Sequence, residues 1–346
     1  MRAELILFNG TIHTLDPLHP TAEAVSVASG RFLGVGALEA VEAASDASSR
    51  RIDLEGRTLI PGFNEASFPL WTGEASFEDA ILAGAKGLLS HGITSITHAG
   101  LLPEHLAVYR ALTESRRMPL RANAIARRYA PDGTKIPLPE RFESNWLRID
   151  TVELFADSDG DPRLRENDQR MQALVWDIHR GGLRASIRAS SEGAIQQAIG
   201  AISYASARLA SRMKHRLEHV AAPNTDQLNH CRGRIGMTVL PSIEGNMLSA
   251  IVAAGVTVAL SGDAAPLATL QAVAARSGLT IADLIPLYTV SAAIMAGEDY
   301  LKGTISPGKY ADFAILSGDP LRAPVDRLSD LSVEMTALNG QIVYAG

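Results

Sequence analysis

The sequence predicts an α/β protein, a (β/α)8 TIM barrel with a small β-sandwich built from both ends of the chain. Between residues 61 and 300, short apolar runs rich in β-branched residues alternate with longer stretches of helical spacing. This alternation is typical of parallel βαβ units. Eight such units fill a span close to the size of a barrel, roughly 250 residues. Residues 1–60 and 301–346 instead carry short runs separated by glycine turns.

The composition excludes several classes of protein. The chain has 346 residues, of which 46% are hydrophobic and 20% charged, which is enough apolar material for a large core. The net charge of −6 argues against nucleic-acid or anionic-membrane partners. The single cysteine, Cys231, excludes an internal disulfide and fits a reducing compartment. No signal peptide is recognised, so we expect a cytoplasmic protein that acts on or binds a small molecule.

The two ends share a pattern of strands and tight turns. Asn9-Gly10, Glu55-Gly56 and Asn339-Gly340 each lie between short apolar runs, which predicts β-hairpins or reversals. We therefore expect residues 1–60 and 301–346 to form one composite β-sandwich domain, and residues 61–300 to form the barrel.

The barrel strands and helices are predicted from the alternation. The expected strands cover residues 59–63, 93–97, 120–125, 152–156, 184–187, 216–220, 237–240 and 256–260. The expected helices cover residues 77–90, 103–116, 166–180, 192–212, 225–231, 246–254 and 267–277. A doubly wound open sheet is the alternative fold, and the lack of a GxGxxG motif after the first strand argues against a dinucleotide site.

Several motifs resemble the amidohydrolase superfamily, in the order that the family shows. These are LIPGFNEASFPLW at 59–71, HGITSITHAG at 91–100, VELFADSDG at 152–160, HRLEHV at 215–220, VALSGDAAP at 258–266 and GTISPGKYADFAILSGDPL at 303–321. The resemblance covers essentially the whole chain and is nearest to bacterial predicted metal-dependent hydrolases with a TIM-barrel fold. Relatives carry a long lid insertion where this chain has residues 71–77.

The resemblance implies a divalent metal at the carboxyl ends of the strands, but this chain departs from the family's ligands. The family's HxH pair corresponds to residues 67–69, which are Ser-Phe-Pro. Its strand-four lysine corresponds to Glu153 and its strand-five histidine to Arg188, while His219 and Asp263 match. An arginine among the ligands repels a dication, so we expect no ordinary binuclear site.

His98 suggests a different metal site. His98, Glu153, His219 and Asp263 would lie at the upper ends of even-numbered strands, which converge in a barrel mouth. Two histidines and two carboxylates suit mononuclear Zn or Mn, so we expect either one such ion or none.

Each of these residues also has a structural interpretation. His219 could be a hydrogen-bonded residue at a strand end, and Asp263 could pair with a cation or cap a turn. Glu153 could form an ion pair with Arg188 on the neighbouring strand.

Other polar residues carry weaker hypotheses. His215 lies deeper in the barrel and is expected to be structural, whereas His179 is expected to be solvated. The pair Arg127-Arg128 could bind an anion or form part of a solvated face.

Two functions remain open. The first is a hydrolase of carbon–nitrogen bonds other than peptide bonds, as the resemblance implies. In it Asp263 would act as base, His219 would orient water or substrate, and Arg188 would bind an anionic group or stabilise an oxyanion. The second is a catalytically inactive barrel that binds a small ligand or serves in an assembly. The resemblance also allows a homodimer.

Overall fold

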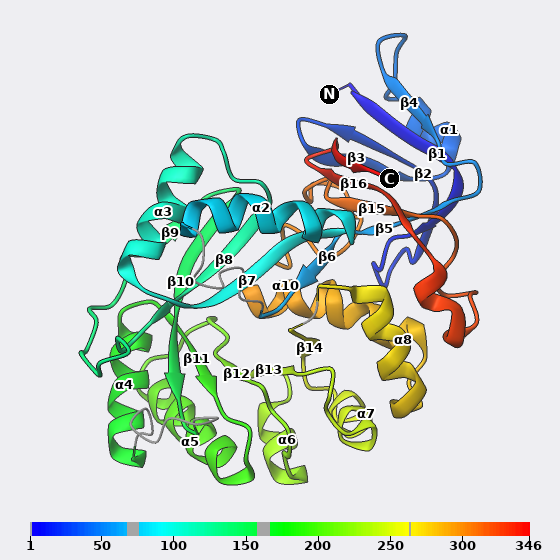
Figure 1. Ribbon diagram of the computed structural model, residues 1–346. Helices are drawn as coiled ribbons and strands as arrows, with labels where there is room; N and C mark the ends of the chain where they lie inside the picture. The colour runs from blue at the N-terminus through cyan, green and yellow to red at the C-terminus, as the bar shows by residue number, and fades with distance from the viewer. Residues whose placement is uncertain (1, 68–75, 158–166, 263) are drawn as a thin grey trace.

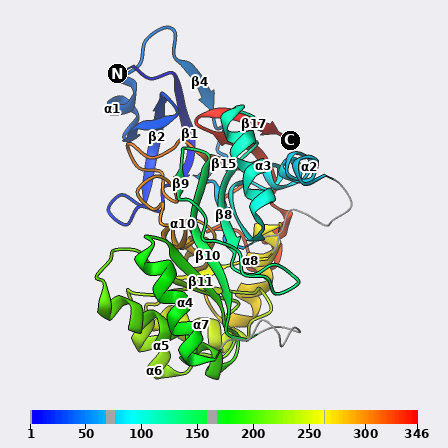
Figure 2. The ribbon, with the colours of Figure 1, turned by 90° about the vertical axis from the view of Figure 1, so that its left-hand side faces the viewer.

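A computed structural model describes residues 2–67, 76–157, 167–262 and 264–346. It contains a parallel sheet surrounded by helices and, beside it, a second sheet that carries both chain ends (Figure 1). Figure 2 shows the second sheet at one end of the molecule, with the parallel strands and their helices at the other. The chain therefore has the α/β architecture that the sequence predicts.

The parallel sheet is a nearly closed barrel of eight strands. Their order is β6-β7-β8-β10-β11-β12-β13-β14, with the short β9 (Phe142–Glu143) added to β10. The strands are β6 (Phe63–Glu65), β7 (Ile93–Leu101), β8 (Arg121–Arg127), β10 (Leu147–Phe155), β11 (Arg184–Arg188), β12 (Arg216–Glu218), β13 (Gly236–Val239) and β14 (Val258–Leu260). Within the described residues β6 and β14 form no backbone ladder, so a seam lies between the first and last strands.

Helices follow the barrel strands and cover their outer surface (Figure 1). They are α2 (Phe77–Ser90), α3 (Pro103–Glu114), α4 (Asp168–Arg180), α5 (Glu192–Arg208), α6 (Thr225–Cys231), α7 (Gly245–Ala253), α8 (Pro266–Ser277), α9 (Ile281–Leu284) and α10 (Val290–Ala296). The predicted bounds of α2 and α6 are confirmed. Serine or asparagine caps start several of these helices, as with Ser76, which accepts from the backbone N–H of Asp79.

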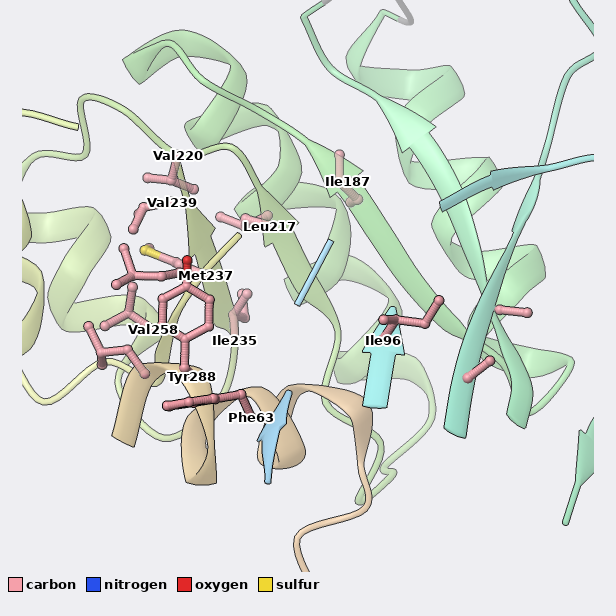
Figure 3. Close-up of a cluster of buried hydrophobic side chains, with 14 of the residues drawn as sticks. Phe63, Ile96, Ile187, Leu217, Val220, Ile235, Met237, Val239, Val258 and Tyr288 are labelled. Atoms are coloured by element: carbon pink, nitrogen blue, oxygen red, sulfur yellow. The ribbon is translucent and has the colours of Figure 1, made fainter. Parts of the chain in front are cut away.

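The main hydrophobic core lies between the strands and the helices. Its members alternate along each strand with residues that face the barrel interior, because successive side chains point to opposite faces. Figure 3 shows part of it, with Leu217, Met237 and Val258 from neighbouring strands. Phe63 meets the ring of Tyr288 edge to face, with centroids 6.3 Å apart. The outer face of the barrel is therefore apolar, which leaves its inner face for polar groups.

The second sheet joins the two ends of the chain. Its order is β17-β16-β15-β5-β1-β2-β3, with β4 paired to β1, so it forms one continuous hydrogen-bonded sheet. The strands are β1 (Leu5–His13), β2 (Thr21–Ala28), β3 (Arg31–Gly36), β4 (Arg50–Asp53), β5 (Thr58–Pro61), β15 (Phe313–Leu316), β16 (Val333–Leu338) and β17 (Gln341–Ala345), and α1 (Leu38–Glu42) lies beside β2. β15 runs antiparallel to β5, which places a C-terminal strand beside an N-terminal one.

The predicted first barrel strand at residues 59–63 is wrong in one respect, because the chain changes sheet within it. β5 ends at Pro61 in the second sheet, and β6 begins the barrel at Phe63. Gly62 makes the crossing, and its N–H donates to the carbonyl oxygen of Asp312 over 3.0 Å. A Cβ at Gly62 would lie 2.2 Å from Oγ1 of Thr94, so the close approach requires glycine.

Among the described residues, no single helix is long and apolar enough to cross a membrane, although α8 together with the stretch Ile281–Ala296 passes that test as a strongly bent pair.

Candidate functional site

A cavity of about 440 Å³ opens at the carboxyl ends of the barrel strands. The loops at this end carry the active sites of barrel enzymes. The cavity is lined by residues from all eight barrel strands or the turns that follow them. Six of them bear on its chemistry, namely Ser67, Arg127, Glu153, Phe155, Arg188 and His219.

Glu153 lies on the inner face of β10 and is only 3% exposed. Burial raises the pKa of this carboxyl group, and Arg188 and Arg127 act in the opposite direction. The nearest guanidinium nitrogen, Nη2 of Arg188, is 3.9 Å from its Oε1. The expected ion pair between Glu153 and Arg188 is therefore present as a loose contact at the limit of such pairs.

Arg127 and Arg188 approach the cavity from the strands on either side of β10. Their guanidinium carbons lie 5.7 and 5.6 Å from the ring centroid of Phe155. These distances are within the range of cation–π contacts, about 6 Å. The described part of the mouth thus combines two permanent cations, one aromatic ring and one buried carboxylate.

A tightly bonded pair lies next to this group in the barrel interior. Glu218 on β12 accepts from the guanidinium of Arg216, from Oγ of Ser186 at 2.6 Å and from Oγ1 of Thr238 at 2.7 Å. Burial alone would raise the pKa of Glu218, but Arg216 and these donors hold the pKa below its usual value. Glu218 is therefore a buried anion whose acceptors are occupied, which suits a structural role.

A third polar layer lies nearer the amino ends of the strands. Asp150 accepts from Nε of Arg148 at 2.6 Å and from Nη2 of Arg184 at 2.6 Å. Despite burial, which raises it, these two cations lower the pKa of Asp150 to about 2. Both arginines also donate to carbonyl groups around α10, Arg184 to Met295 and Arg148 to Gly297. This layer therefore ties the barrel floor to α10.

His219 lines the mouth cavity, as expected, directly after β12. Its backbone has φ +55°, in the left-handed region that residues other than glycine adopt infrequently. The N–H of His219 donates to Oγ1 of Thr238 over 3.0 Å, which holds this turn against β13. Such backbone strain is concentrated at functional sites.

His98 does not join this group. Its neighbour Ala99 lines the cavity, so His98 points to the opposite face of β7, between the barrel and the helices. Its Nδ1 is 2.9 Å from the hydroxyl of Tyr109 on α3, and Phe77 stacks on it at 5.7 Å. Burial lowers the pKa of His98 to about 4, followed by a smaller effect of His105. The structure thus assigns His98 to a packed aromatic cluster.

The remaining predicted residues fall outside the described part of the chain. These are Asp263, the expected base, Phe68 and Pro69 of the HxH positions, and most of the proposed lid position. Gly262, the residue before Asp263, does line the cavity. Of the predicted site residues, the structure therefore brings together Glu153, Arg188 and His219, and Ser67 lines the same cavity.

Sequence reasoning missed two residues of the mouth. Phe155 was not considered, and Arg127 was not distinguished from its neighbour Arg128 as a site residue. The available signal was strand periodicity, because Arg121, Asn123 and Arg127 share the inner face of β8.

A profile described as "Amidohydrolase family" matches residues 72–344. The chain belongs to the amidohydrolase family. A search of curated proteins finds a similar stretch in the putative amidohydrolase YtcJ of Bacillus subtilis (strain 168), with 39% identity over 66 residues. That stretch covers 19% of this chain and 12% of the Bacillus protein, so only about an eighth of that relative is compared.

Solved structures with the fold of this amidohydrolase family member match it over nearly its whole length. An uncharacterised metal-dependent hydrolase from Pyrococcus furiosus superposes with a TM-score of 0.75 and 15% identity, over 92% of this chain and 100% of that one. An adenosine deaminase from Xanthomonas campestris with bound Zn superposes with a TM-score of 0.72 and 13% identity, over 99% of this chain and 93% of that one. At such identities the likeness shows the fold alone.

The described residues do not fit the metal that the family implies. Among them, no group of three or more His, Cys, Asp or Glu side chains is arranged to hold an ion. Two guanidinium groups line the cavity, those of Arg127 and of Arg188, which the resemblance places at a ligand position. Two fixed positive charges disfavour a dication there.

Proposed function

We propose that this family member acts on a small molecule in the mouth cavity, as a hydrolase of carbon–nitrogen bonds other than peptide bonds. The observation that carries the proposal is the cavity itself, which gathers His219, Glu153 and Arg188 at the carboxyl ends of the strands. Its volume, about 440 Å³, lies within the usual range for sites of small ligands.

The proposed chemistry uses protein groups. Asp263 takes a proton from water as the water oxygen attacks the carbonyl carbon, and His219 orients that water or the substrate. Arg188 binds an anionic group of the substrate and so positions the carbonyl carbon for attack. The carbon–nitrogen bond then breaks, and the proton held by Asp263 passes to the leaving nitrogen.

The second candidate function is a catalytically inactive barrel that binds a small ligand. It is favoured by the two guanidinium groups at the mouth, which suit binding of an anion better than binding of a catalytic metal. The two candidates share the cavity and differ in turnover.

The test is a screen of amides, cyclic ureas, lactams and N-acyl amino acids, after chelation and again with Zn or Mn added. The proposal expects turnover in the chelated protein, and Asp263→Asn should abolish it. Asp330→Asn is the control and should leave turnover unchanged, because Asp330 is an exposed carboxylate between β15 and β16. Binding without turnover under every condition would favour the inactive barrel. Turnover only with stoichiometric metal would overturn the metal-independent chemistry.

A further inference from the structure

The strand register places one arginine on each side of β10, next to Glu153 and Phe155. Arg127 on β8 is the register partner of Glu153 on β10, and Arg188 on β11 is the partner of Phe155. All four side chains line the same cavity. Their relative positions are therefore fixed by backbone ladders within the barrel, which favours a preorganised binding site.

The two guanidinium groups have donors to spare. Nε of Arg127 and Nε of Arg188 are both buried without a hydrogen-bond partner within the described residues. Among the described residues, the nearest anion to Arg188 is Oε1 of Glu153 at 3.9 Å, too far for a hydrogen bond. A guanidinium offers five N–H donors, and buried donors left unsatisfied cost about 1–3 kcal/mol each. A ligand with acceptor oxygens would remove that penalty.

Elsewhere in the barrel interior the arginines are hydrogen-bonded to carboxylates, whereas at the mouth the nearest such contact is only a loose one. Arg216 is hydrogen-bonded to Glu218, and Arg184 and Arg148 both bond to Asp150. Among the described residues that line the mouth, two arginines face one carboxylate, that of Glu153. A ligand with one negative charge would balance this group, whereas a dianion would place excess negative charge beside Glu153.

We propose that Arg127 and Arg188 bind the carboxylate of a small monoanionic molecule, with Phe155 packing against its apolar part. The geometry of a carboxylate matches the fork of a guanidinium, which can donate two parallel hydrogen bonds. The inference deepens the proposed function by naming the class of molecule that the same cavity takes, a carboxylate-bearing compound.

The test uses a matched pair of probes on the full-length chain. N-benzoylglycine carries one carboxylate and a planar ring, and N-benzoylglycinamide is its neutral counterpart of nearly equal size. Calorimetric titration at low ionic strength should show the acid binding at least about tenfold more tightly than the amide. Its affinity should fall as salt is added, because ionic contacts at a partly open site are screened. Inorganic phosphate should bind more weakly than the acid.

Variants of the two arginines locate the contact. Arg188→Gln and Arg127→Gln should each weaken binding of the acid about tenfold or more, with little effect on the amide. Arg188→Lys should lose part of the affinity, because lysine keeps the charge but not the fork. Arg212→Gln is the matched control, since Arg212 is exposed in the connection before β12, at the opposite end of the barrel. It should leave both affinities unchanged.

The outcomes separate the carboxylate site from the hydrolase. Equal affinity for acid and amide, no binding of the acid below about 10 mM, or retained affinity in both glutamine variants would overturn the carboxylate site. Tight binding of the acid without any hydrolysis would support the site while counting against the proposed activity. Hydrolysis of neutral amides at the same rate in both arginine variants would support the activity while counting against the carboxylate site. If one glutamine variant does not fold, the other and Arg188→Lys decide.

Discussion

Arg121 in β8 and Asp312, just before β15, form a two-pronged buried ion pair with N–O distances of 2.5 and 2.8 Å. The pair connects the barrel to the second sheet across 191 residues of sequence. Nη2 of Arg121 also donates to Oδ1 of Asn339 at 2.6 Å, and its guanidinium lies over the ring of Tyr310 at 3.7 Å. One side chain thereby contacts the chain just before β15 and the turn between β16 and β17.

Asp312→Asn should destabilise the protein strongly. It leaves the Arg121 charge buried without its anion, a loss of about 3 to 5 kcal/mol in other buried pairs. Urea unfolding followed by circular dichroism measures the change. Asp330→Asn is the matched control, because its pair with Arg327 is 71% and 60% exposed. Such surface pairs contribute at most about 1 kcal/mol. Equal losses in the two variants would contradict this interpretation.

His215 should make the protein less stable in acid. The N–H of Ala185 donates to its Nδ1, so Nε2 carries the proton and donates to Nδ1 of His179, whose Nε2 in turn donates to the carbonyl of Leu209. Burial, followed by His179 and Arg184, lowers the pKa of His215 to about 3. Between that value and about 6.5 the unfolded chain binds a proton that the folded chain does not. Stability should therefore fall as the pH drops below about 6.5, by up to about 1.4 kcal/mol per unit.

The contribution of His215 is isolated by His215→Asn, whose side-chain oxygen can still accept from Ala185. Urea unfolding between pH 5 and 7 measures the slope of the free energy of unfolding against pH. In the variant this slope should be smaller, by an amount that corresponds to up to one bound proton. His98 changes stability in the same direction and is common to both proteins, so it cancels in the comparison. Identical slopes would show that His215 does not titrate differently on folding.

Glu153→Gln should strengthen binding of N-benzoylglycine. The substitution removes a carboxylate that shares the two arginines with the ligand, while it keeps the shape of the side chain. We expect the dissociation constant to fall about threefold or more, against the loss expected for both arginine variants. Calorimetry on the same preparation measures both. Weaker binding in this variant would mean that Glu153 positions the arginines instead of competing with the ligand.

Cys231 should be unreactive until the protein unfolds. It is fully buried at the end of α6, and burial raises the pKa of its thiol to about 12. The thiolate is the reactive form, so a thiol reagent at pH 8 should modify almost none of the native protein. In denaturant it should titrate one thiol per chain. Rapid labelling of the native protein would reveal local opening around α6.

Periodicity predicted the larger part of the fold because each barrel strand is apolar on its outer face and each helix covers that face. The prediction from periodicity failed where one short apolar run was compatible with more than one arrangement of the chain. Residues 59–63 look like one strand, yet Gly62 lets the chain pass from one sheet to the other. His179 was expected to be solvated, but it is 1% exposed because α4 turns that face toward His215.

The site was less predictable, since it depends on which face of a strand a residue occupies. His98 and Ala99 are adjacent in sequence, and only Ala99 reaches the mouth. The placement of Arg127 and Phe155 at the mouth follows only from the strand register, which sets β8 and β11 on either side of β10. The family positions Arg188, Glu153 and His219 were found from the resemblance, because the order of motifs fixes the strand on which each lies.

The seam between β6 and β14 links the mouth to the integrity of the ring. Oε1 of Glu65 accepts from the N–H of Ser67 at 3.1 Å and from the N–H of Gly262 at 2.9 Å, so a side chain bridges the first and last strands where a backbone ladder would otherwise run. Ser67 and Gly262 also line the cavity. A molecule bound in the cavity would contact the residues that join the first and last strands. Binding should therefore also stabilise the barrel against separation of β6 from β14.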